Sequence, residues 1–320
     1  MAKEKLIVIL GPTASGKTGL SIDLAKKLDT EIISGDSMLV YKGFDIGSAK
    51  PTEEEKSGIV HHMIDILEPE EKFNVADFVT EVKKLISEIN AKGKIPILAG
   101  GTGLYIKSLL EGYEFNETAG DSKYRAYLEK LAEEKGREFV FDMLKKANPE
   151  VAERLHINNF RRVIRALEVH HLGGEEISTA RKADMNENSV VDSSESLVYD
   201  VTVIGLNWER SVLYDRINKR VDIMMEQGLE REVRHLLESG VSAECQPMKG
   251  IGYKEMVKYV NGEISLEQAV DDIKKNTRHF AKRQLTWYRK MPYIKWFYHN
   301  VAEDSNLYRW GMNATSTEFT

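Results

Sequence analysis

The sequence contains one cysteine, Cys245, among its 320 residues, and it has no long hydrophobic run. A single cysteine excludes both a disulfide framework and a zinc site built from cysteine pairs. No apolar stretch reaches the roughly twenty residues that a membrane-spanning helix needs. The N-terminus does not resemble a secretory signal peptide, because a glycine-rich loop begins almost at once. We therefore expect a soluble cytoplasmic protein, monomeric and without a membrane partner.

Acidic residues are absent from residues 273–300, although the net charge of the whole chain is −6. This stretch is instead rich in basic and aromatic side chains, namely Lys274, Lys275, Arg278, Phe280, Lys282, Arg283, Trp287, Tyr288, Arg289, Lys290, Tyr293, Lys295, Trp296, Phe297 and Tyr298. Such a mixture suits single-stranded or looped RNA, because basic groups neutralise phosphates and aromatic faces stack on unpaired bases. A C-terminal helix with a solvated basic face and an aromatic core face is the alternative.

The pattern G-x-x-x-x-G-K-[ST], which binds phosphate groups, occurs at residues 11–18. The apolar residues 5–10 predict a buried strand before it, and residues 18–28 have helical spacing after it. Backbone N–H groups of such a loop converge on phosphate oxygens, while Lys17 supplies charge and Thr18 a hydroxyl ligand for Mg²⁺. The loop alone leaves open whether the phosphate belongs to ATP. The predicted phosphate site consists of Gly11, Pro12, Thr13, Ala14, Ser15, Gly16, Lys17 and Thr18.

Alternating strands and helices predict an α/β fold, a mostly parallel sheet covered on both faces. Hydrophobic residues make up 42% of the chain, enough for one large or two modest domains. Asp36 follows the second strand, at the edge where open sheets bind ligands, and is a candidate base or magnesium ligand. A helix cap or turn is the alternative role. Further strands are expected at residues 31–34, 61–66, 94–99 and 197–206, and further helices at 75–89, 104–110, 210–238 and 265–289.

The sequence changes character after about residue 115, where helical periodicity and high charge replace the alternating pattern. We therefore predict an all-helical insertion domain at residues 116–198, within a P-loop NTPase-like core formed by residues 1–115 and 199–320. Residues 184–196, which are polar and rich in Asn and Ser, predict a mobile loop.

Three arginines of the predicted insertion lie close together in the sequence. Arg161 and Arg165 are four residues apart and so share one helix face, with Arg162 beside them. Such a face can grip phosphates, and a solvated helix surface is the alternative.

Segments along nearly the whole chain resemble the ordered motifs of tRNA dimethylallyltransferases. They are residues 11–18, 34–41, 45–51, 61–66, 100–105, 161–168, 220–224, 251–255 and 281–287. The resemblance implies transfer of a dimethylallyl group from dimethylallyl diphosphate to the N6 amine of the adenine just 3′ of the tRNA anticodon. It also implies a phosphate-loop core with a helical insertion, and a channel that the flipped adenine and the donor enter from opposite ends.

The same resemblance implies roles for individual residues. Asp36 matches the base that takes the proton of the adenine amine, and Thr102 matches a position close to that amine. Arg220 matches a second ligand of the diphosphate, for which a bidentate guanidinium is well suited. The phosphate loop and Mg²⁺ would stabilise the leaving diphosphate as its negative charge grows.

Flipping the adenine costs unstacking energy, so contacts elsewhere must hold the anticodon stem-loop. This role favours the RNA interpretation of residues 273–300. The tRNA-binding residues implied by the resemblance are Asp36, Ser37, Met38, Leu39, Thr102, Arg125, Arg161, Arg162, Val163, Ile164, Arg165, Lys249, Gly252, Tyr253, Thr277, Arg278, Lys282, Arg283 and Gln284.

Some positions depart from the family pattern. Leu39 stands where the pattern has glutamine, Lys249 and Gly250 where it has glutamine and alanine, and Gly173 where threonine is usual. Leucine cannot hydrogen-bond a base edge. We therefore expect catalysis to be preserved and RNA recognition to be altered.

Two other classes of protein also use a phosphate loop of this kind. A small-molecule kinase would use ATP there with Asp36 as the base for a hydroxyl, but it has no evident use for the basic residues of the insertion or the C-terminal stretch. An RNA-binding ATPase or GTPase without prenyl transfer is the second alternative, and it would not need Asp36 for its RNA-dependent function.

Overall fold

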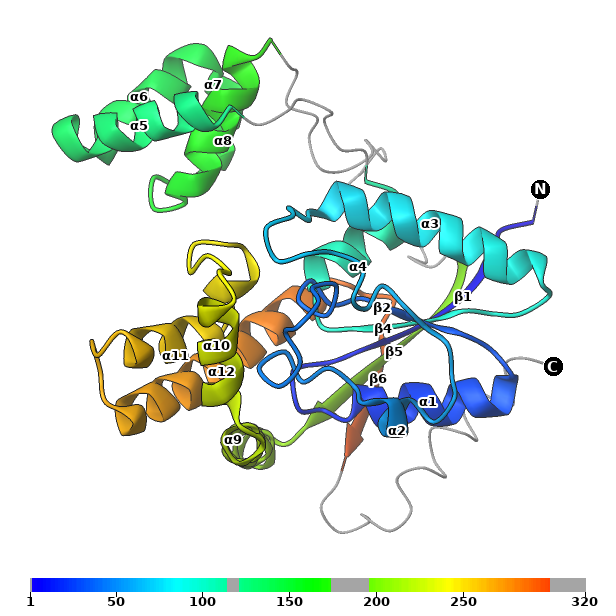
Figure 1. Ribbon diagram of the computed structural model, residues 1–320. Coiled ribbons are helices and arrows are strands. Elements are labelled where there is room, and N and C mark those ends of the chain that lie inside the picture. Colours follow the sequence, from blue (N-terminus) through cyan, green and yellow to red (C-terminus); the bar gives the residue numbers. More distant parts are fainter. Residues whose placement is uncertain (1, 114–120, 174–195, 300–320) are drawn as a thin grey trace. The chain divides into compact units, whose positions relative to one another are not determined.

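The computed structural model describes residues 2–113, 121–173 and 196–299, whose course Figure 1 shows. The chain forms two compact units, one made of Met1–Glu111 with Ser189–Thr320 and the other of Gly112–Asn188. Each unit is described by itself. Residues 184–195 of the predicted mobile loop lie outside the described residues. The domain boundaries predicted from the sequence and the RNA-binding role of the insertion stay predictions.

A six-stranded sheet in the order β3-β2-β4-β1-β5-β6 forms the centre of the first unit. Every pairing in it is parallel, and Val8 of the central strand lies between Leu98 and Val203. Because both faces are covered, β1 is a continuous apolar run. The strands are β1 (Lys5–Leu10), β2 (Ile32–Ser34), β3 (His61–His62), β4 (Ile97–Gly100), β5 (Asp200–Trp208) and β6 (Lys295–His299). The predicted α/β fold is confirmed.

Helices cover both faces of this sheet, with α1 on one side and α3 and α4 on the other (Figure 1). Under α1, Ile22 and Ala25 pack against Ile9 and Ile97 of the sheet. In the described ranges, no helix is both long and apolar enough to cross a membrane. The helices of this unit are α1 (Lys17–Leu28), α2 (Glu53–Lys56), α3 (Val75–Ala91), α4 (Gly103–Leu110), α9 (Arg210–Gln227), α10 (Leu229–Glu238), α11 (Tyr253–Val260) and α12 (Leu266–Tyr288), with a 3-10 turn at Pro247–Lys249.

The third predicted strand, residues 61–66, is wrong beyond its first two residues. Met63 has a φ of 62° and Asp65 a φ of 54°, in the left-handed region, and such backbone cannot continue a strand. The strand predicted from residue 94 begins only at Ile97, because Pro96 has no N–H to donate to a neighbouring strand.

The edge strand β6 was not predicted, because it lies inside the basic and aromatic stretch. It pairs with β5, with Trp296 opposite Gly205. A Cβ atom on Gly205 would lie 2.8 Å from the Trp296 ring, so the absence of a side chain there makes room for the indole. The alternative of a single C-terminal helix is therefore wrong for the end of that stretch.

The second unit consists of four helices in its described residues, and no strand occurs among them. They are α5 (Ser122–Lys135), α6 (Arg137–Ala147), α7 (Pro149–Arg154) and α8 (Phe160–His171). Leu128, Val140, Leu144 and Leu167 meet in a separate apolar core. The all-helical character predicted for the insertion is confirmed for residues 121–173.

Candidate active site

The phosphate loop connects β1 to α1, as the sequence predicts. Gly16 has a φ of 96°, a left-handed conformation that glycine adopts without strain, and α1 begins at the next residue. A Cβ atom on Gly11 would lie 2.5 Å from the carbonyl oxygen of Leu206 and 2.7 Å from Ser15 Oγ. Both glycines are therefore required, the first for close approach to β5 and the second for the turn into the helix.

Lys17 lies against the loop that precedes it. Its ammonium donates hydrogen bonds to the carbonyl oxygens of Gly11 at 3.0 Å and Pro12 at 2.9 Å. Burial, and then the positive charge of Arg220, lower the pKa of Lys17 to about 8, while Asp36 acts in the opposite direction. The lowered pKa means that the protonated form of Lys17 is unfavourable in these surroundings. A bound phosphate anion would stabilise this positive charge.

Arg220 extends from α9 toward the same site. Burial lowers its pKa, and the attraction of Asp36 and then of Glu55 opposes this effect. Arg220, Lys17 and Asp36 therefore act on one another electrostatically, although they come from three different elements. The cluster carries two cations and one anion, an excess of positive charge that a diphosphate would balance.

Asp36 lies in the turn after β2, beside the glycine turn that follows β4. Its Oδ1 accepts a hydrogen bond from the N–H of Met38 at 2.8 Å. Thr102 joins the two turns, because its Oγ1 accepts from the N–H of Ser37 at 3.3 Å and its own N–H donates to Gly35 O at 3.3 Å. The structure thus brings together the phosphate loop, Asp36, Thr102 and Arg220; their catalytic roles stay predictions.

Two residues that sequence reasoning missed hold the phosphate loop in place. Arg216 of α9 donates from Nε to Ala14 O at 2.9 Å, and its guanidinium lies 4.4 Å from the centre of the Trp208 ring. Trp208, the last residue of β5, donates from Nε1 to Ser15 O at 3.1 Å. Arg216 lies four residues before Arg220, so the spacing along α9 was the available signal.

Several residues predicted to bind tRNA have buried side chains. The Tyr253 hydroxyl donates to Glu232 Oε1 at 2.7 Å, and burial first and then Glu232 raise its pKa far above the ordinary value. Val163 and Ile164 pack in the core of the helical unit. Gln284 is 5% exposed. These four residues are buried as whole residues, backbone included, so they offer almost no surface to RNA.

Other predicted tRNA-binding residues of the first unit are more accessible. Lys282 and Arg283 are exposed on α12. Lys249 is exposed and pairs with Glu244 at 2.9 Å. Arg278 donates to Asn218 Oδ1 at 2.6 Å. Ser37, Met38, Leu39 and Thr277 are partly buried. Gly252 is the exception, because it is buried in the turn before α11, where its φ is 100°.

The aromatic residues of the C-terminal stretch are mostly structural. Tyr288 is completely buried, so it has no face open to a nucleobase, and the stacking role is wrong for it. Trp296 and Phe297 belong to β6 and are partly buried, whereas Tyr298 is 65% exposed. Apart from Tyr298, the basic side chains of this stretch rather than its aromatic ones therefore form the surface that RNA could meet.

In the helical unit, a buried carboxylate organises two of the predicted arginines. Glu168 is completely buried and accepts hydrogen bonds from Arg125 at 2.9 and 3.0 Å and from Arg165 at 2.6 Å. Burial would raise the pKa of Glu168, but these bonds outweigh burial and lower it. Arg161 and Arg162 are exposed on the same helix. The pairing between Glu168 and Arg125 could not be predicted, because the two residues are far apart in the chain.

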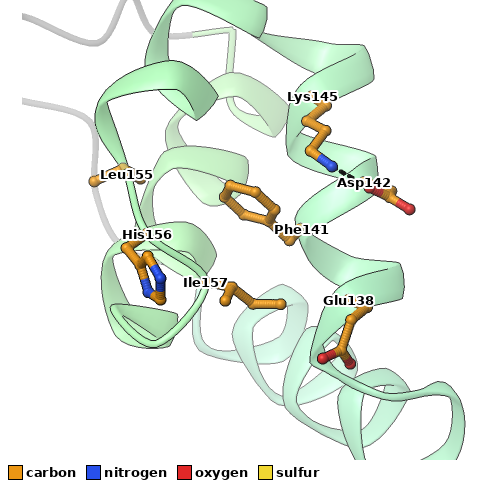
Figure 2. A pocket seen from close by; sticks show the side chains of 7 residues that line it. All are labelled: Glu138, Phe141, Asp142, Lys145, Leu155, His156 and Ile157. Carbon is orange, nitrogen blue, oxygen red and sulfur yellow. Dashed lines mark hydrogen bonds and ion pairs between the residues drawn. The ribbon is translucent and has the colours of Figure 1, made fainter.

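The same unit carries an open pocket between α6 and the segment after α7 (Figure 2). It is lined by Glu138, Phe141, Asp142, Lys145, Leu155, His156 and Ile157. None of the predicted site residues lines it. Among the described residues, no group of three or more His, Cys, Asp or Glu side chains is placed to hold a metal ion.

Comparison with known proteins agrees with this arrangement. A family model described as IPP transferase matches residues 39–291. The tRNA dimethylallyltransferase of Bacillus anthracis is 54% identical over 297 residues, which cover 93% of this chain and 91% of that protein.

Two solved structures are also similar. The tRNA isopentenylpyrophosphate transferase of Bacillus halodurans is 42% identical, with a TM-score of 0.69 and coverage of 98% of both chains. The tRNA delta(2)-isopentenylpyrophosphate transferase of Staphylococcus epidermidis is 42% identical, with a TM-score of 0.70 and coverage of 99% of both chains. The chain belongs to the IPP transferase family.

Proposed function

We propose that this chain is a tRNA dimethylallyltransferase, which moves the dimethylallyl group of dimethylallyl diphosphate to the N6 amine of the adenine 3′ of the anticodon. The observation that carries the proposal is the position of the phosphate loop beside Asp36 and Thr102, with Arg220 acting electrostatically on both Lys17 and Asp36. A donor diphosphate and an acceptor amine need adjacent sites of this kind. Family membership favours this function over a small-molecule kinase or an RNA-binding NTPase.

The donor diphosphate binds to the phosphate loop, residues 11–18. Backbone N–H groups at the start of α1 point toward the anion, and the helix dipole adds to their effect. Lys17 and Arg220 supply the positive charge. Because negative charge accumulates on the diphosphate as the allylic C–O bond breaks, these groups stabilise the transition state more than the ground state.

Mg²⁺ fits the first turn of α1, where Thr18 is exposed and offers a hydroxyl oxygen. Magnesium in phosphate sites usually takes one or two protein ligands and fills its other positions with phosphate oxygens and water. With Thr18 as its protein ligand, a bound Mg²⁺ would neutralise charge on the leaving diphosphate.

The acceptor adenine reaches the site from the side of Asp36 and Thr102. Its N6 lone pair is delocalised into the ring, so the amine is a weak nucleophile. As N6 bonds to the allylic carbon and the C–O bond to diphosphate breaks, a proton leaves N6 for the carboxylate of Asp36. The hydrogen bond from Met38 N–H holds that carboxylate in place.

The anticodon stem-loop is held by the exposed basic residues. Lys282 and Arg283 on α12, with Arg161 and Arg162 on α8, are accessible to phosphates. Glu168 holds the guanidinium groups of Arg125 and Arg165 in a fixed direction. We expect the protein to act on tRNA in the cytoplasm, as a monomer.

Complementation tests the function directly. Cells that lack their endogenous enzyme are given this chain, and their tRNA is digested and measured by mass spectrometry. We expect N6-dimethylallyladenosine to appear, and its absence would refute the proposal. Incubation of purified protein with tRNA and either labelled ATP or labelled dimethylallyl diphosphate separates the alternatives, because only the prenyl donor should transfer label to RNA.

The affinity for the donor should depend on pH through Lys17, whose pKa is about 8. A bound diphosphate favours the protonated amine, so binding above this pH takes up a proton and weakens by up to about tenfold per pH unit. Calorimetry with dimethylallyl S-thiolodiphosphate, a non-reacting analogue, measures this. Lys17→Arg keeps its charge and should remove the decline, whereas a flat wild-type affinity up to about pH 9.5 would contradict the assignment.

Leu39 is the departure from the family pattern closest to Asp36 in the chain. Its backbone oxygen accepts from Asp65 N–H, and this bond does not involve the side chain, which is partly exposed. Leu39→Gln should raise kcat/KM for anticodon stem-loop RNA by up to about tenfold, the worth of one hydrogen bond. Leu39→Met, which adds no amide, is the matched control. Equal kcat/KM values for the two variants would show that residue 39 does not read the RNA.

A further inference from the structure

Helix α12 contacts both loops of the active site through two buried side chains, Gln284 and Tyr288. Gln284 Oε1 accepts from the N–H of Thr13 at 2.9 Å, and its Nε2 donates to Gly101 O at 2.9 Å. The Tyr288 hydroxyl lies 2.8 Å from Gly101 O and 3.2 Å from Gly11 O, and its single hydrogen is shared between these two acceptors. The two side chains are four residues apart and therefore lie on the same face of α12.

These contacts connect the phosphate loop to the glycine turn after β4. Among the described residues, no other side-chain hydrogen bond connects the two. The phosphate loop follows β1 and the glycine turn follows β4, and the two strands are neighbours with Leu10 opposite Gly100. A Cβ atom on Gly101 would lie 2.6 Å from Gln284 Nε2, so the glycine lets the amide reach the backbone. The three backbone groups satisfied by α12 belong to Gly11, Thr13 and Gly101.

The link continues to the catalytic carboxylate. Residue 102 follows Gly101 directly, and its hydroxyl accepts from the N–H of Ser37, next to Asp36. A continuous series of bonds therefore runs from the diphosphate loop through α12 to the turn that carries the base. Burial and then the charge of Asp36 raise the pKa of Tyr288, which keeps its hydroxyl protonated as a donor.

We propose that Gln284 and Tyr288 are positioning residues, which set the distance between the donor diphosphate and the base that deprotonates the acceptor amine. Gln284 thus acts by holding the two loops and not by binding tRNA. The inference rests on the proposed function, because that function places the two substrates at these loops. Prenyl transfer needs N6, the allylic carbon and the carboxylate aligned at once, and small displacements from such alignment are costly.

Tyr288→Phe is the sharpest test, because it removes one hydroxyl and keeps the ring. The Gly11 and Gly101 carbonyls would each lose one donor and keep one, from Lys17 and Gln284 respectively, so the connection between the two loops is weakened. We expect kcat to fall by about ten- to a hundredfold, while the Kd for anticodon stem-loop RNA changes less than about twofold. Gln284→Glu should act in the same direction, since a carboxylate cannot donate to Gly101 O.

Thr286→Ala is the control, because Thr286 lies exposed on the same helix and its hydroxyl bonds only to Lys282 O within that helix. All variants are assayed well below their melting temperatures. Affinity for dimethylallyl S-thiolodiphosphate gives a readout that needs no turnover, and it should weaken severalfold in Tyr288→Phe and Gln284→Glu.

The outcomes separate the possible roles. Weaker RNA binding with unchanged kcat in Gln284→Glu would make this residue an RNA contact and overturn the proposal. Unchanged kcat and unchanged analogue affinity in both variants would also overturn it. If the wild type itself transfers no prenyl group, the proposed function fails; the analogue affinities still decide whether α12 positions the phosphate loop.

Discussion

Replacing Asp36 with asparagine should abolish prenyl transfer, with kcat at least about a thousandfold lower, within the range that a general base contributes. Asparagine has the same shape, and its Oδ1 can still accept the hydrogen bond from Met38 N–H. It cannot take the proton from N6. Single-turnover transfer to anticodon stem-loop RNA at saturating donor measures the loss.

The same variant should bind the donor at least as tightly as the wild type. Asp36 is the negative charge that opposes the effects of burial on Lys17 and Arg220. Without it, the net positive charge around the diphosphate is larger. Glu68→Gln removes an exposed carboxylate that pairs with Lys42 and should leave kcat unchanged. Transfer by Asp36→Asn at more than about a tenth of the wild-type rate would exclude Asp36 as the base.

The sequence was sufficient to predict the phosphate loop and its neighbours. The loop is encoded locally, by glycines at the two positions where a Cβ would collide or where φ is positive. Asp36 was placed near the loop because the carboxyl ends of parallel strands meet at one edge. Local chemistry and one topological rule were enough for these residues.

The spacing of apolar residues along α12 predicts which of its faces is buried, although the many basic residues of the helix suggest an RNA-binding surface instead. Ile273, Ala281, Gln284 and Tyr288 are buried, and their spacing follows one helix face. A polar Gln284 within that apolar stripe was the signal that it bonds to protein groups rather than to RNA.

Other contacts could not be predicted because their partners are distant in the chain. Glu168 is close enough in sequence to pair with Arg165, but its bond to Arg125 depends on how α5 packs on α8. Likewise, Tyr253 is buried because Glu232 of α10 accepts its hydroxyl and Gly47 leaves room for its ring. Packing between helices, which periodicity does not specify, decides these cases.

Replacing Lys17 with methionine should lower kcat/KM for dimethylallyl diphosphate by about a thousandfold or more, since one preorganised donor at a developing anion is worth roughly a hundred- to a thousandfold and the donor site also loses a full charge. The folded protein should stay about as stable. Burial and the nearby charge of Arg220 lower the pKa of Lys17 to about 8, which means that the native structure disfavours its charge. Methionine fills a similar volume without that charge, but it loses the hydrogen bonds to Gly11 O and Pro12 O. These two effects oppose each other, so the melting temperature at pH 7 should change little.

This combination of lost activity and retained stability identifies a residue kept for function. Lys17→Arg separates charge from shape: it should retain more donor affinity than Lys17→Met, because it remains a cation within the loop. Calorimetry with the thiolodiphosphate and thermal unfolding of all three proteins check the argument. If Lys17→Met binds the analogue as tightly as the wild type, Lys17 does not contribute to donor binding. The unfavourable charge of Lys17 would then have no explanation in the proposed function.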